Sequence, residues 1–239
     1  LAGQTFKEAL RFRPDVIHGH MHEGALIGGV MSRLSGVPLV FDYQGSLTAE
    51  MVDHHFLNPR GRVYPWAHRL ETLITRRLPH AILASSGQAI ALLRDQFKVP
   101  ADRIHALPDC ADATQFNPAL FPFEPAAHPL RVKFNISPDT TIVGYLGLLT
   151  DYQGIPHLIE SAVELRKRGE DVHFLIMGYP NVDRYQTIAR LRGVEDMITF
   201  TGRIPFAQAP YYLSVCDIAV APKMSTSEGS GKLLNYMAM

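Results

Sequence analysis

The sequence predicts an α/β protein built from two Rossmann-like domains, each containing a doubly wound parallel sheet. Short runs of β-branched or apolar residues alternate with longer segments of helical period along all 239 residues, a pattern typical of parallel sheets with helices on both faces. Several of these runs are apolar throughout, as strands buried on both faces are. A proline-rich stretch at residues 116–138 separates two such βαβ repeats, so we expect it to connect the domains.

The elements follow one another in a regular order. The apolar runs predict strands at residues 15–18, 38–42, 81–84, 103–107, 141–146, 172–177, 197–201 and 217–221. The intervening segments carry apolar residues at helical spacing and predict helices at residues 23–34, 69–77, 87–97, 155–168, 184–192 and 207–215. Each predicted strand except the last of each repeat is therefore followed by a segment that can cross back over the sheet.

The proline-rich stretch sets the expected domain limits. We expect a first domain at residues 1–133, including the connecting segment, and a second at residues 134–239. The chain starts at Leu1 without an initiator methionine and stops at Met239 inside a helix-like segment that has no capping or breaking residue. These ends predict a fragment, with the first strand of the first domain missing and the second domain incomplete.

Composition excludes several classes of protein. The 23 basic and 23 acidic residues cancel and form no run of like charge, so bulk charge supports neither a nucleic-acid partner nor an anionic membrane surface. Cys110 and Cys216 lie far apart and outside any metal-binding spacing, which fits a reduced intracellular compartment. No stretch reaches the roughly 20 apolar residues of a membrane span, and the first residues lack the basic-then-apolar layout expected of a signal peptide. We expect a cytoplasmic protein, with peripheral contact at the inner face of the membrane left open.

Sheets of this kind bind ligands beyond the carboxyl ends of their strands, where loops lead into helix N-termini. This rule selects residues 18–24, 42–47, 147–154, 178–181, 202–205 and 222–232. The chemistry of the protein is therefore expected in these six loops.

The strongest pattern is the tail at residues 227–238, which reads SEGSGKLLNYMA and follows a predicted strand through a polar loop. Gly229 and Gly231 would let backbone N–H groups approach an anion at a helix N-terminus, whose dipole favours a diphosphate. Glu228 would accept hydrogen bonds from sugar or ribose hydroxyls. An ordinary strand-to-helix turn explains the same pattern, and this alternative stays open.

Two nucleotide-binding classes do not fit. A P-loop needs a glycine where Thr226 stands and Ser or Thr where Leu233 stands, so an NTPase is not expected. A dinucleotide dehydrogenase is a poor match, because no G-x-G-x-x-G follows a strand with an acidic residue placed after it.

Four motifs occur in the order found in one family. Residues 108–112, PDCAD, with Phe116 and Pro118 look like P-N-G-V-D-x-x-x-F-x-P, and residues 201–205, TGRIP, look like F-x-G-x-V-P. Residues 217–222 look like A-D-V-F-V-x-P, and the tail looks like E-G-F-G…E-A-M-A. Each motif alone is weak, but together they resemble the retaining family-4 glycosyltransferases of the GT-B fold, also called the group 1 type.

The resemblance implies two Rossmann-like domains facing across a cleft and an enzyme of the EC 2.4 class. Such a hexosyl- or related transferase moves a sugar from a nucleotide diphosphate sugar to a saccharide, lipid or other small acceptor, with retention of anomeric configuration. The resemblance also implies no cofactor and no bound metal. The second domain would bind the donor and the first domain the acceptor.

The resemblance assigns most donor residues to the second domain. It places the base near Arg203 and Ile204 and the diphosphate near the tail. The expected diphosphate contacts are Gly229, Ser230, Gly231, Lys232 and Leu233. The family's second tail glutamate, which meets the ribose, falls at Asn235 when the Tyr-Met-Ala residues are aligned, and at Tyr236 by counting from Glu228; we assign the ribose contact to Asn235.

One motif departs from the family in a way that matters for catalysis. The family's G-R-L-x-x-x-K-G reads GLLTDYQG at residues 147–154, so Gly147 remains, Gln153 replaces the lysine, and both cations are absent. A leaving diphosphate needs positive charge, because charge develops on it in the transition state. Lys223 and Lys232 are the expected replacements. The alternative is that both are ordinary solvated surface lysines.

The first domain carries the run HGHMHEG at residues 18–24, at the end of a predicted strand. Three alternate histidines suggest zinc, but no second cluster would complete such a site. In the family a histidine in this H-x-H position lies near the acceptor and the donor sugar, which makes His20 the candidate catalytic residue and Glu23 a candidate for acceptor hydroxyls. A simple helix-capping role for these residues is the alternative.

A second loop of the first domain, residues 42–46 with the sequence DYQGS, also ends a predicted strand and is rich in hydrogen-bonding groups. We assign Gln44 and Ser46 to the acceptor. A solvated loop explains the same composition.

Retaining enzymes of this group lack an obvious protein nucleophile, so catalysis would depend on leaving-group stabilisation by Lys223 and Lys232 and on positioning by His20 and Glu228. Two other functions stay open. A non-catalytic sugar-nucleotide-binding or scaffold module is favoured by the missing loop cations. A nucleotide-sugar epimerase shares the fold but has no local signature here.

Overall fold

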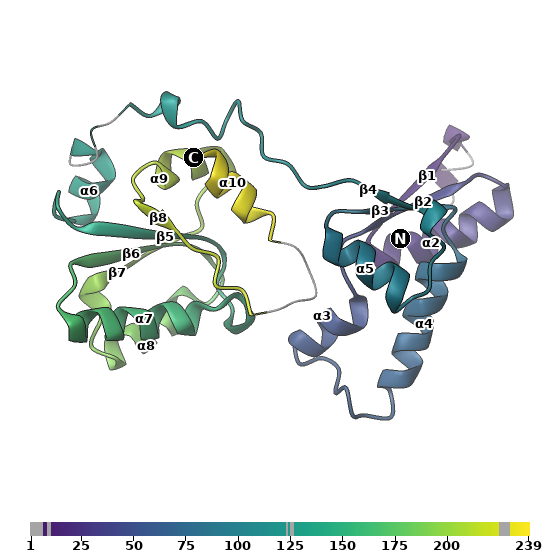
Figure 1. Cartoon of the computed structure of the whole chain (residues 1–239), viewed down its shortest axis with the longest axis horizontal. Helices are drawn as coiled ribbons and strands as arrows, with labels where there is room; N and C mark the ends of the chain where they lie inside the picture. The colour runs from purple at the N-terminus through teal and green to yellow at the C-terminus, as the bar shows by residue number, and fades with distance from the viewer. Residues whose placement is uncertain (1–6, 9–10, 123, 125–126, 225–229) are drawn as a thin grey trace. The chain divides into compact units, whose positions relative to one another are not determined.

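The structure, a computed structural model, describes residues 7–8, 11–122, 124, 127–224 and 230–239. It forms two compact units, one from the described residues up to Asp109 and one from the described residues after it. Each unit contains a four-stranded parallel sheet with packed helices (Figure 1). The predicted fold class, α/β with two Rossmann-like parallel-sheet domains, is confirmed.

The first unit has the strand order β1-β2-β3-β4. Its elements in chain order are β1 (Ile17–His20), α2 (Met21–Ser35), β2 (Leu39–Tyr43), α3 (Leu47–Asp53), α4 (Tyr64–Arg77), β3 (Ala81–Ala84), α5 (Gly87–Asp95) and β4 (Ile104–Ala106). Because the side chains of a strand alternate between its two faces, β2 buries Leu39, Phe41 and Tyr43 completely and leaves Asp42 half-buried on the other face. The helices α2, α4 and α5 all pack on the Phe41 face (Figure 1).

This arrangement decides where the polar residues of β1 and β2 point. His20 lies directly beside Asp42 in the parallel register, so both occupy the face opposite the core. Among the described residues, helices cover only one face of this sheet. The polar ends of β1 and β2 are therefore free to form a site.

The second unit has the strand order β7-β6-β5-β8. Its longer elements are α6 (Pro129–Phe134), β5 (Thr141–Leu148), α7 (Ile155–Arg168), β6 (Val172–Tyr179), α8 (Val182–Leu191), β7 (Ile198–Gly202), α9 (Ala209–Leu213), β8 (Ile218–Ala219) and α10 (Lys232–Ala238). Short 3-10 turns join them at Pro118–Leu120, Asp151–Gln153, Glu195–Met197 and Phe206–Gln208. The chain moves outward from β5 to β7 and then returns to the other side of β5, so the strand order reverses at β5.

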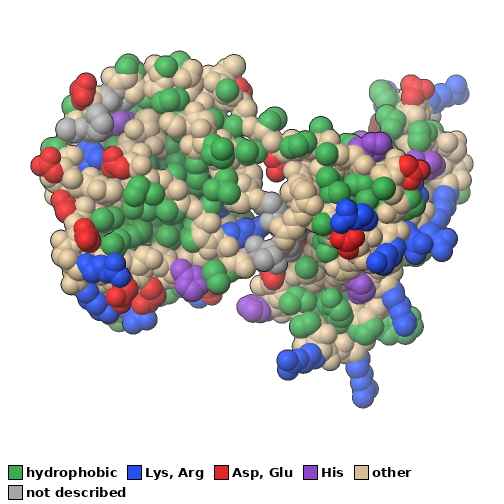
Figure 2. Space-filling view, viewed as in Figure 1, with side chains coloured by type: hydrophobic (Ala, Val, Ile, Leu, Met, Phe, Trp, Pro, Cys, Tyr) green, Lys and Arg blue, Asp and Glu red, His purple; other side chains and the backbone are tan. Residues whose placement is uncertain are grey.

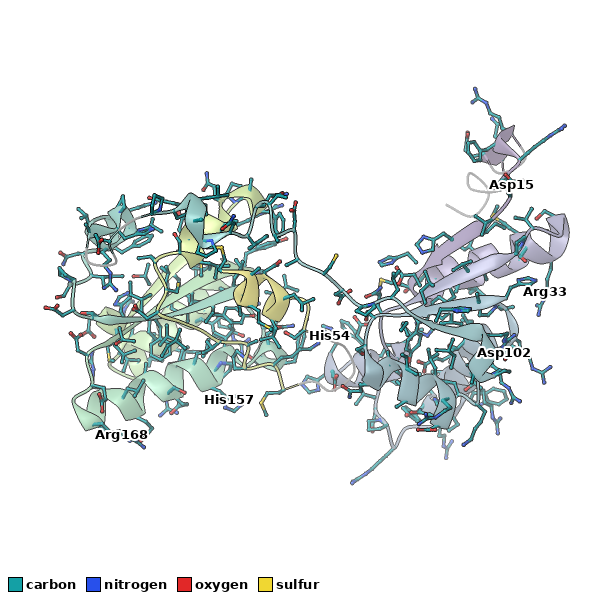
Figure 3. All side chains as sticks on the ribbon, turned by 45° about the horizontal axis from the view of Figure 1, so that its top comes forward. Asp15, Arg33, His54, Asp102, His157 and Arg168 are labelled. Carbon is teal, nitrogen blue, oxygen red and sulfur yellow. The ribbon has the colours of Figure 1, made fainter. Side chains whose placement is uncertain are left out.

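Helices cover both faces of this second sheet (Figure 1). Tyr145 and Ile176 face α7 and α8, whereas Ile142, Leu175 and Met177 face α6, α9 and α10. This two-sided burial explains why the strands read as continuous apolar runs. The last turn of α7 is basic and ends at Arg168, which extends away from the unit (Figure 3).

All eight predicted strands are present, with shifts at their ends. The first differs most, because the run predicted to end at His18 continues to His20 and α2 begins at Met21. Two short helices, α3 and α6, were not predicted. α6 begins at Pro129 inside the proline-rich stretch, where the absent proline N–H costs nothing because the first turn of a helix leaves it unpaired.

The compact units divide at Asp109, whereas the sequence places the domain boundary after residue 133. Phe116 and Leu130, from the segment between these limits, are buried in the core of the second unit. Within the ranges that the structure describes, no helix is both long and apolar enough to cross a membrane.

The contact between β5 and β6 gives a test of the second unit. Gly178 lies beside Gly147, and a Cβ atom at position 178 would stand 1.8 Å from the Gly147 carbonyl oxygen. We expect Gly178→Ala to lower the free energy of unfolding of this unit by about 1–3 kcal/mol or more, because the backbone must shift. Urea unfolding measures the change.

Gly169→Asn is the matched control in the same unit. A Cβ atom added at this position meets no atom within 4 Å, and the φ of +73° is one that asparagine tolerates better than most other non-glycine residues. We expect only a small change in the free energy of unfolding for this variant. Equal unfolding midpoints for the two variants would show that the close contact at Gly178 is not a constraint.

Candidate functional site

A pocket of about 500 Å³ lies in the second unit at the carboxyl ends of β5 and β6. The turn after β7 and the helix α10 complete its walls. It therefore lies at the reversal of strand order, the place where open α/β sheets bind nucleotides. Its volume is in the range of small-molecule sites.

The structure brings six of the predicted donor residues together around this pocket. They are Gly147, Gln153, Arg203, Ile204, Lys232 and Asn235. Lys232 is the first residue of α10 and Asn235 follows one turn later. Residues that are separate motifs in the sequence thus share one cavity.

The remaining predicted residues of the second domain lie beside the pocket or outside the described ranges. Gly231 precedes α10, and Leu233 is on the helix but does not line the pocket. Ser230 buries a hydroxyl that finds no hydrogen-bond partner in the described part of the chain. Glu228 and Gly229 lie outside the described residues.

Lys232 has a specific set of contacts. Its Nζ donates hydrogen bonds to Gln153 Oε1 at 2.8 Å and to the Tyr145 hydroxyl at 3.2 Å, and it lies 4.5 Å from the centre of the Tyr145 ring. A Cβ atom at position 147 would stand 2.7 Å from this nitrogen. A glycine at position 147 therefore leaves room for the ammonium group.

The electrostatics of the pocket are those of an anion site. Burial, together with the smaller effect of the nearby charge of Lys223, lowers the pKa of Lys232 from 10.5 to about 8. Lys232 and Arg203 both line the pocket, and none of its described lining residues is a carboxylate. An anionic ligand would relieve the cost of the poorly solvated ammonium group.

The loop at residues 147–154 lies within reach of Lys232. Gln153 stands where the family motif has lysine, and its side chain is buried and reaches the Lys232 ammonium group. The positive charge of Lys232, at the start of α10, is therefore one hydrogen bond away from the side chain at the family's lysine position, and its role as a replacement for the loop cations stays a prediction. Leu148, at the arginine position of the motif, is half-exposed and apolar.

An aromatic residue that the sequence analysis missed completes the pocket. Tyr179 ends β6 and lines the cavity, with the Arg203 guanidinium 5.0 Å from the centre of its ring. A ring and a guanidinium plane together make a surface on which a nucleobase can stack. The sequence feature that could have identified Tyr179 was an aromatic residue at the carboxyl end of an apolar strand.

A second group of polar residues lies in the first unit. His20 Nδ1 lies 2.7 Å from Asp42 Oδ2, and Gln44 Nε2 donates to Asp42 Oδ1 at 2.6 Å. A carboxylate only accepts hydrogen bonds, so Nδ1 of His20 carries the proton and Nε2 is left for another partner. Asp42 therefore orients two predicted site residues, although it was not itself assigned to the site.

The three histidines of the run at residues 18–24 do not share one face. His18 and His20 share a face of β1, but His22 is in the first turn of α2 and is buried. Glu23, in the same turn, is exposed. The described residues contain no group of His, Cys, Asp or Glu arranged to hold a metal ion.

Ser46 has a structural partner. It is buried, and its Oγ accepts a hydrogen bond from the Ala49 backbone N–H at 3.2 Å as the N-cap of α3. The first backbone N–H groups of a helix have no acceptor within the helix, and this bond supplies one of them with an acceptor. The acceptor roles of Ser46, Gln44 and Glu23 stay predictions.

Two parallel-sheet units and a cationic pocket at a strand-order reversal define a two-domain, nucleotide-binding type of α/β protein. Sequence comparison agrees with this class: residues 2–110 match the model "Glycosyl transferase 4-like domain", and residues 128–239 match "Glycosyl transferases group 1". The chain belongs to the group 1, GT4-like family of glycosyltransferases, which have the GT-B fold. The resemblance inferred from the four sequence motifs is confirmed.

Curated relatives share moderate identity with the chain. It is 30% identical over 198 residues to the alpha-D-kanosaminyltransferase of Streptomyces kanamyceticus, covering 81% of this chain and 48% of the relative. It is 24% identical over 244 residues to the 2-deoxystreptamine glucosyltransferase of the same organism, covering 95% and 58%. The chain thus spans about half the length of these relatives.

Solved structures agree on the fold. The crystal structure of Anabaena Alr3699/HepE in complex with UDP-glucose matches with a TM-score of 0.78 at 15% identity, covering 99% of this chain and 60% of that one. At this identity the likeness establishes the architecture.

The state of Lys232 can be measured directly. We expect its side chain to titrate near pH 8, well below the usual lysine value of 10.5, because burial disfavours the ammonium form. Lys223→Met should raise this pKa, since the charge of Lys223 contributes to the shift. NMR of protein labelled at lysine Cε measures both, with the signal assigned by comparison with Lys232→Met.

The same shift predicts a stability effect with a defined sign. Below pH 8 Lys232 is protonated in the folded and unfolded chain, and the cost of its burial is fully present. Between about 8 and 10.5 the folded chain has lost this proton while the unfolded chain keeps it, so stability rises with pH relative to Lys232→Met. Titration of Lys232 at the usual lysine value of 10.5 would contradict the assignment.

Proposed function

We propose that the protein is a retaining glycosyltransferase of the EC 2.4 class, which moves a sugar from a nucleotide diphosphate sugar to a small acceptor. One observation carries the proposal: a pocket in the donor-binding half of a GT4-like chain holds the half-buried Lys232 beside the residue that replaces the family's loop lysine. Family membership of both halves and the names of the two relatives, a kanosaminyltransferase and a glucosyltransferase, support it.

In this proposal the second domain, assigned to residues 134–239, binds the donor. The base stacks on Tyr179 and Arg203, the ribose meets Asn235, and the diphosphate lies near Lys232 with Lys223 close by. Lys232 stabilises the charge that develops on the leaving diphosphate, and a site of low polarity makes this contribution larger than it would be in water. Binding of UDP-glucose by the structurally similar Anabaena protein supports a nucleotide-sugar donor.

The first domain, assigned to residues 1–133, provides the acceptor side. His20 presents Nε2, oriented by Asp42, to an acceptor hydroxyl, and Gln44 and Glu23 contribute further polar contacts. The relative named for 2-deoxystreptamine suggests a compact, highly polar acceptor. Positioning of the acceptor hydroxyl against the donor sugar supplies much of the rate, since no protein nucleophile takes part.

Nucleotide binding tests the role of Lys232. We expect Lys232→Ala in the complete protein to weaken binding of UDP, GDP or ADP, whichever binds, by about tenfold or more, because a charge-assisted contact to the diphosphate is lost. The matching nucleoside, which has no phosphate, should bind equally to both proteins. Calorimetry measures the affinities, and Lys167→Ala, a surface change, is the control.

The affinity of the wild-type protein for the diphosphate should fall as pH rises through about 8, because the ammonium group then loses its proton. Unchanged diphosphate binding in Lys232→Ala would show that the pocket does not use this cation. If the wild-type protein binds nucleotide sugars but transfers no sugar to any acceptor, the non-catalytic binding module is the better description.

We further propose a cytoplasmic location in which the first domain touches an anionic membrane surface. Both cysteines are free thiols, as expected in a reducing compartment. An exposed apolar stripe runs along α4, formed by Val63, Trp66, Leu70 and Leu73. Five exposed arginines accompany it: Arg60, Arg62, Arg69, Arg76 and Arg77. Figure 2 shows basic and hydrophobic side chains together at this end of the unit. This is the composition of a segment that binds at a membrane interface.

Trp66 is the only tryptophan of the chain and reports on this surface. We expect its fluorescence to shift to the blue with vesicles that contain phosphatidylglycerol, and not with pure phosphatidylcholine vesicles. The double variant Arg69→Glu with Arg76→Glu should lose the shift, because the attraction to anionic lipid is gone. A shift that depends on protein concentration without vesicles would instead indicate self-association.

A further inference from the structure

Glu71 of α4 is fully buried, which is unusual for a carboxylate. Its Oε2 accepts hydrogen bonds from the Thr48 backbone N–H at 3.2 Å and from the Thr48 hydroxyl. The nearest ring nitrogens are His22 Nε2 at 3.6 Å and His68 Nδ1 at 3.7 Å. The ion pairs of Glu71 in the described part of the chain involve no Lys or Arg, so a buried carboxyl group, which is costly to desolvate, is kept without a permanent cation beside it.

The partners of Glu71 belong to the two chain segments that carry the candidate acceptor residues. His22 is two residues after His20, in the first turn of α2. Thr48 is two residues after Ser46, in the first turn of α3, and the Ser46 and Thr48 hydroxyl oxygens are 3.4 Å apart. A single side chain of a third element, α4, therefore contacts the starts of both α2 and α3.

A second contact joins the same two segments. The rings of His22 and Tyr43 pack edge to face with centres 5.6 Å apart, and Tyr43 lies between Asp42 and Gln44 in the sequence. Burial lowers the pKa of His22, although the charge of Glu71 opposes this shift. A neutral His22 leaves the Glu71 carboxylate to be satisfied mainly by the two donors of Thr48.

We propose that Glu71 is the positioning residue of the acceptor site: from beneath the sheet end it fixes the starts of α2 and α3, so that His20, Asp42 and Gln44 keep one common geometry. The inference rests on the proposed function for its meaning in catalysis. Its structural part, the effect of Glu71 on the His20–Asp42 pair, stands independently. Glu71 acts through other residues and touches neither donor nor acceptor.

The first test needs no enzymatic activity. In the wild-type protein, ¹⁵N NMR of the histidine rings should show His20 with its proton on Nδ1, as its bond to Asp42 requires. The His20 signals are assigned by comparison with His20→Gln. Glu71→Ala should convert these signals to those of a mixture of tautomers, because the starts of α2 and α3 are no longer held together. Glu71→Gln, which can still accept from Thr48, should keep the wild-type state.

The second test uses the complete protein and the transfer reaction. Glu71→Ala should lower kcat/KM for the acceptor by about tenfold or more, while the affinity for the nucleoside diphosphate changes by less than about twofold, because the donor pocket is built from other residues. Glu71→Gln should recover most of the loss. The single variant Thr48→Val should also lower kcat/KM for the acceptor. The double variant Thr48→Val with Glu71→Ala should lose little more than Glu71→Ala does.

Thr75→Val is the matched control. Thr75 is fully buried on the same helix and its hydroxyl lies 3.4 Å from His22 Nε2, so this hydroxyl contacts the start of α2 and, unlike Glu71, makes no hydrogen bond to α3 within the described part of the chain. It should leave the acceptor kcat/KM unchanged even if it costs stability. An equal loss in Thr75→Val, or unchanged acceptor kinetics in Thr48→Val and Glu71→Ala together with unchanged His20 spectra in both variants, would overturn the proposal.

The two proposals can fail separately. If the wild-type protein shows no transfer with any donor and acceptor, the proposed function fails, whereas the NMR measurement still decides whether Glu71 positions His20. If transfer occurs but Glu71→Ala loses donor and acceptor affinity in parallel, Glu71 is a general stabilising residue and the positioning role is wrong.

Discussion

The pocket of the second unit is organised around one half-buried ammonium group, that of Lys232. Its charge costs free energy in the pocket, as its lowered pKa indicates, and Gln153 and Tyr145 offer it only neutral oxygen atoms. Gly147 leaves room for the ammonium group, and an anion placed beside it would offset the cost. The first unit contains a related case, since the carboxyl group of Glu71 is fully buried and accepts hydrogen bonds from the neutral donors of Thr48. In both units an ionisable group removed from water marks the place where function is expected.

Parallel-sheet geometry brings the rest of the site residues to these charges. Because the carboxyl ends of parallel strands meet at one edge, motifs far apart in the sequence, such as Gly147, Tyr179 and Arg203, line a single pocket. In the first unit the alternation of side chains along β2 sends Phe41 and Tyr43 into the core and Asp42 out of it, beside His20. The same alternation thus stabilises the fold and presents the polar pair.

The strands and the donor pocket were predictable because they depend on local patterns. A strand buried on both faces must be apolar along its length, and phosphate-binding loops must follow such strands. The short helices α3 and α6 were not predictable in this way, because caps and tertiary contacts hold them, including Ser46 and Glu71 for α3. The roles of Asp42 and Tyr145 depend on strand register and on a partner many residues away, which no local pattern contains.

The missing loop cations illustrate how far a motif can be trusted. The physical requirement in such a pocket is a positive charge near the diphosphate, and the requirement concerns a position in space rather than a position in the sequence. A lysine at the start of α10 meets it because its long side chain reaches Gln153, in the loop where the family's lysine would be. The exchange has a consequence for selectivity, since an ammonium group that is partly deprotonated above pH 8 binds an anion less strongly than a loop arginine, whose charge is permanent. A pocket of this kind therefore favours ligands that bring their own full negative charge, as a diphosphate does, over ligands with a single charge.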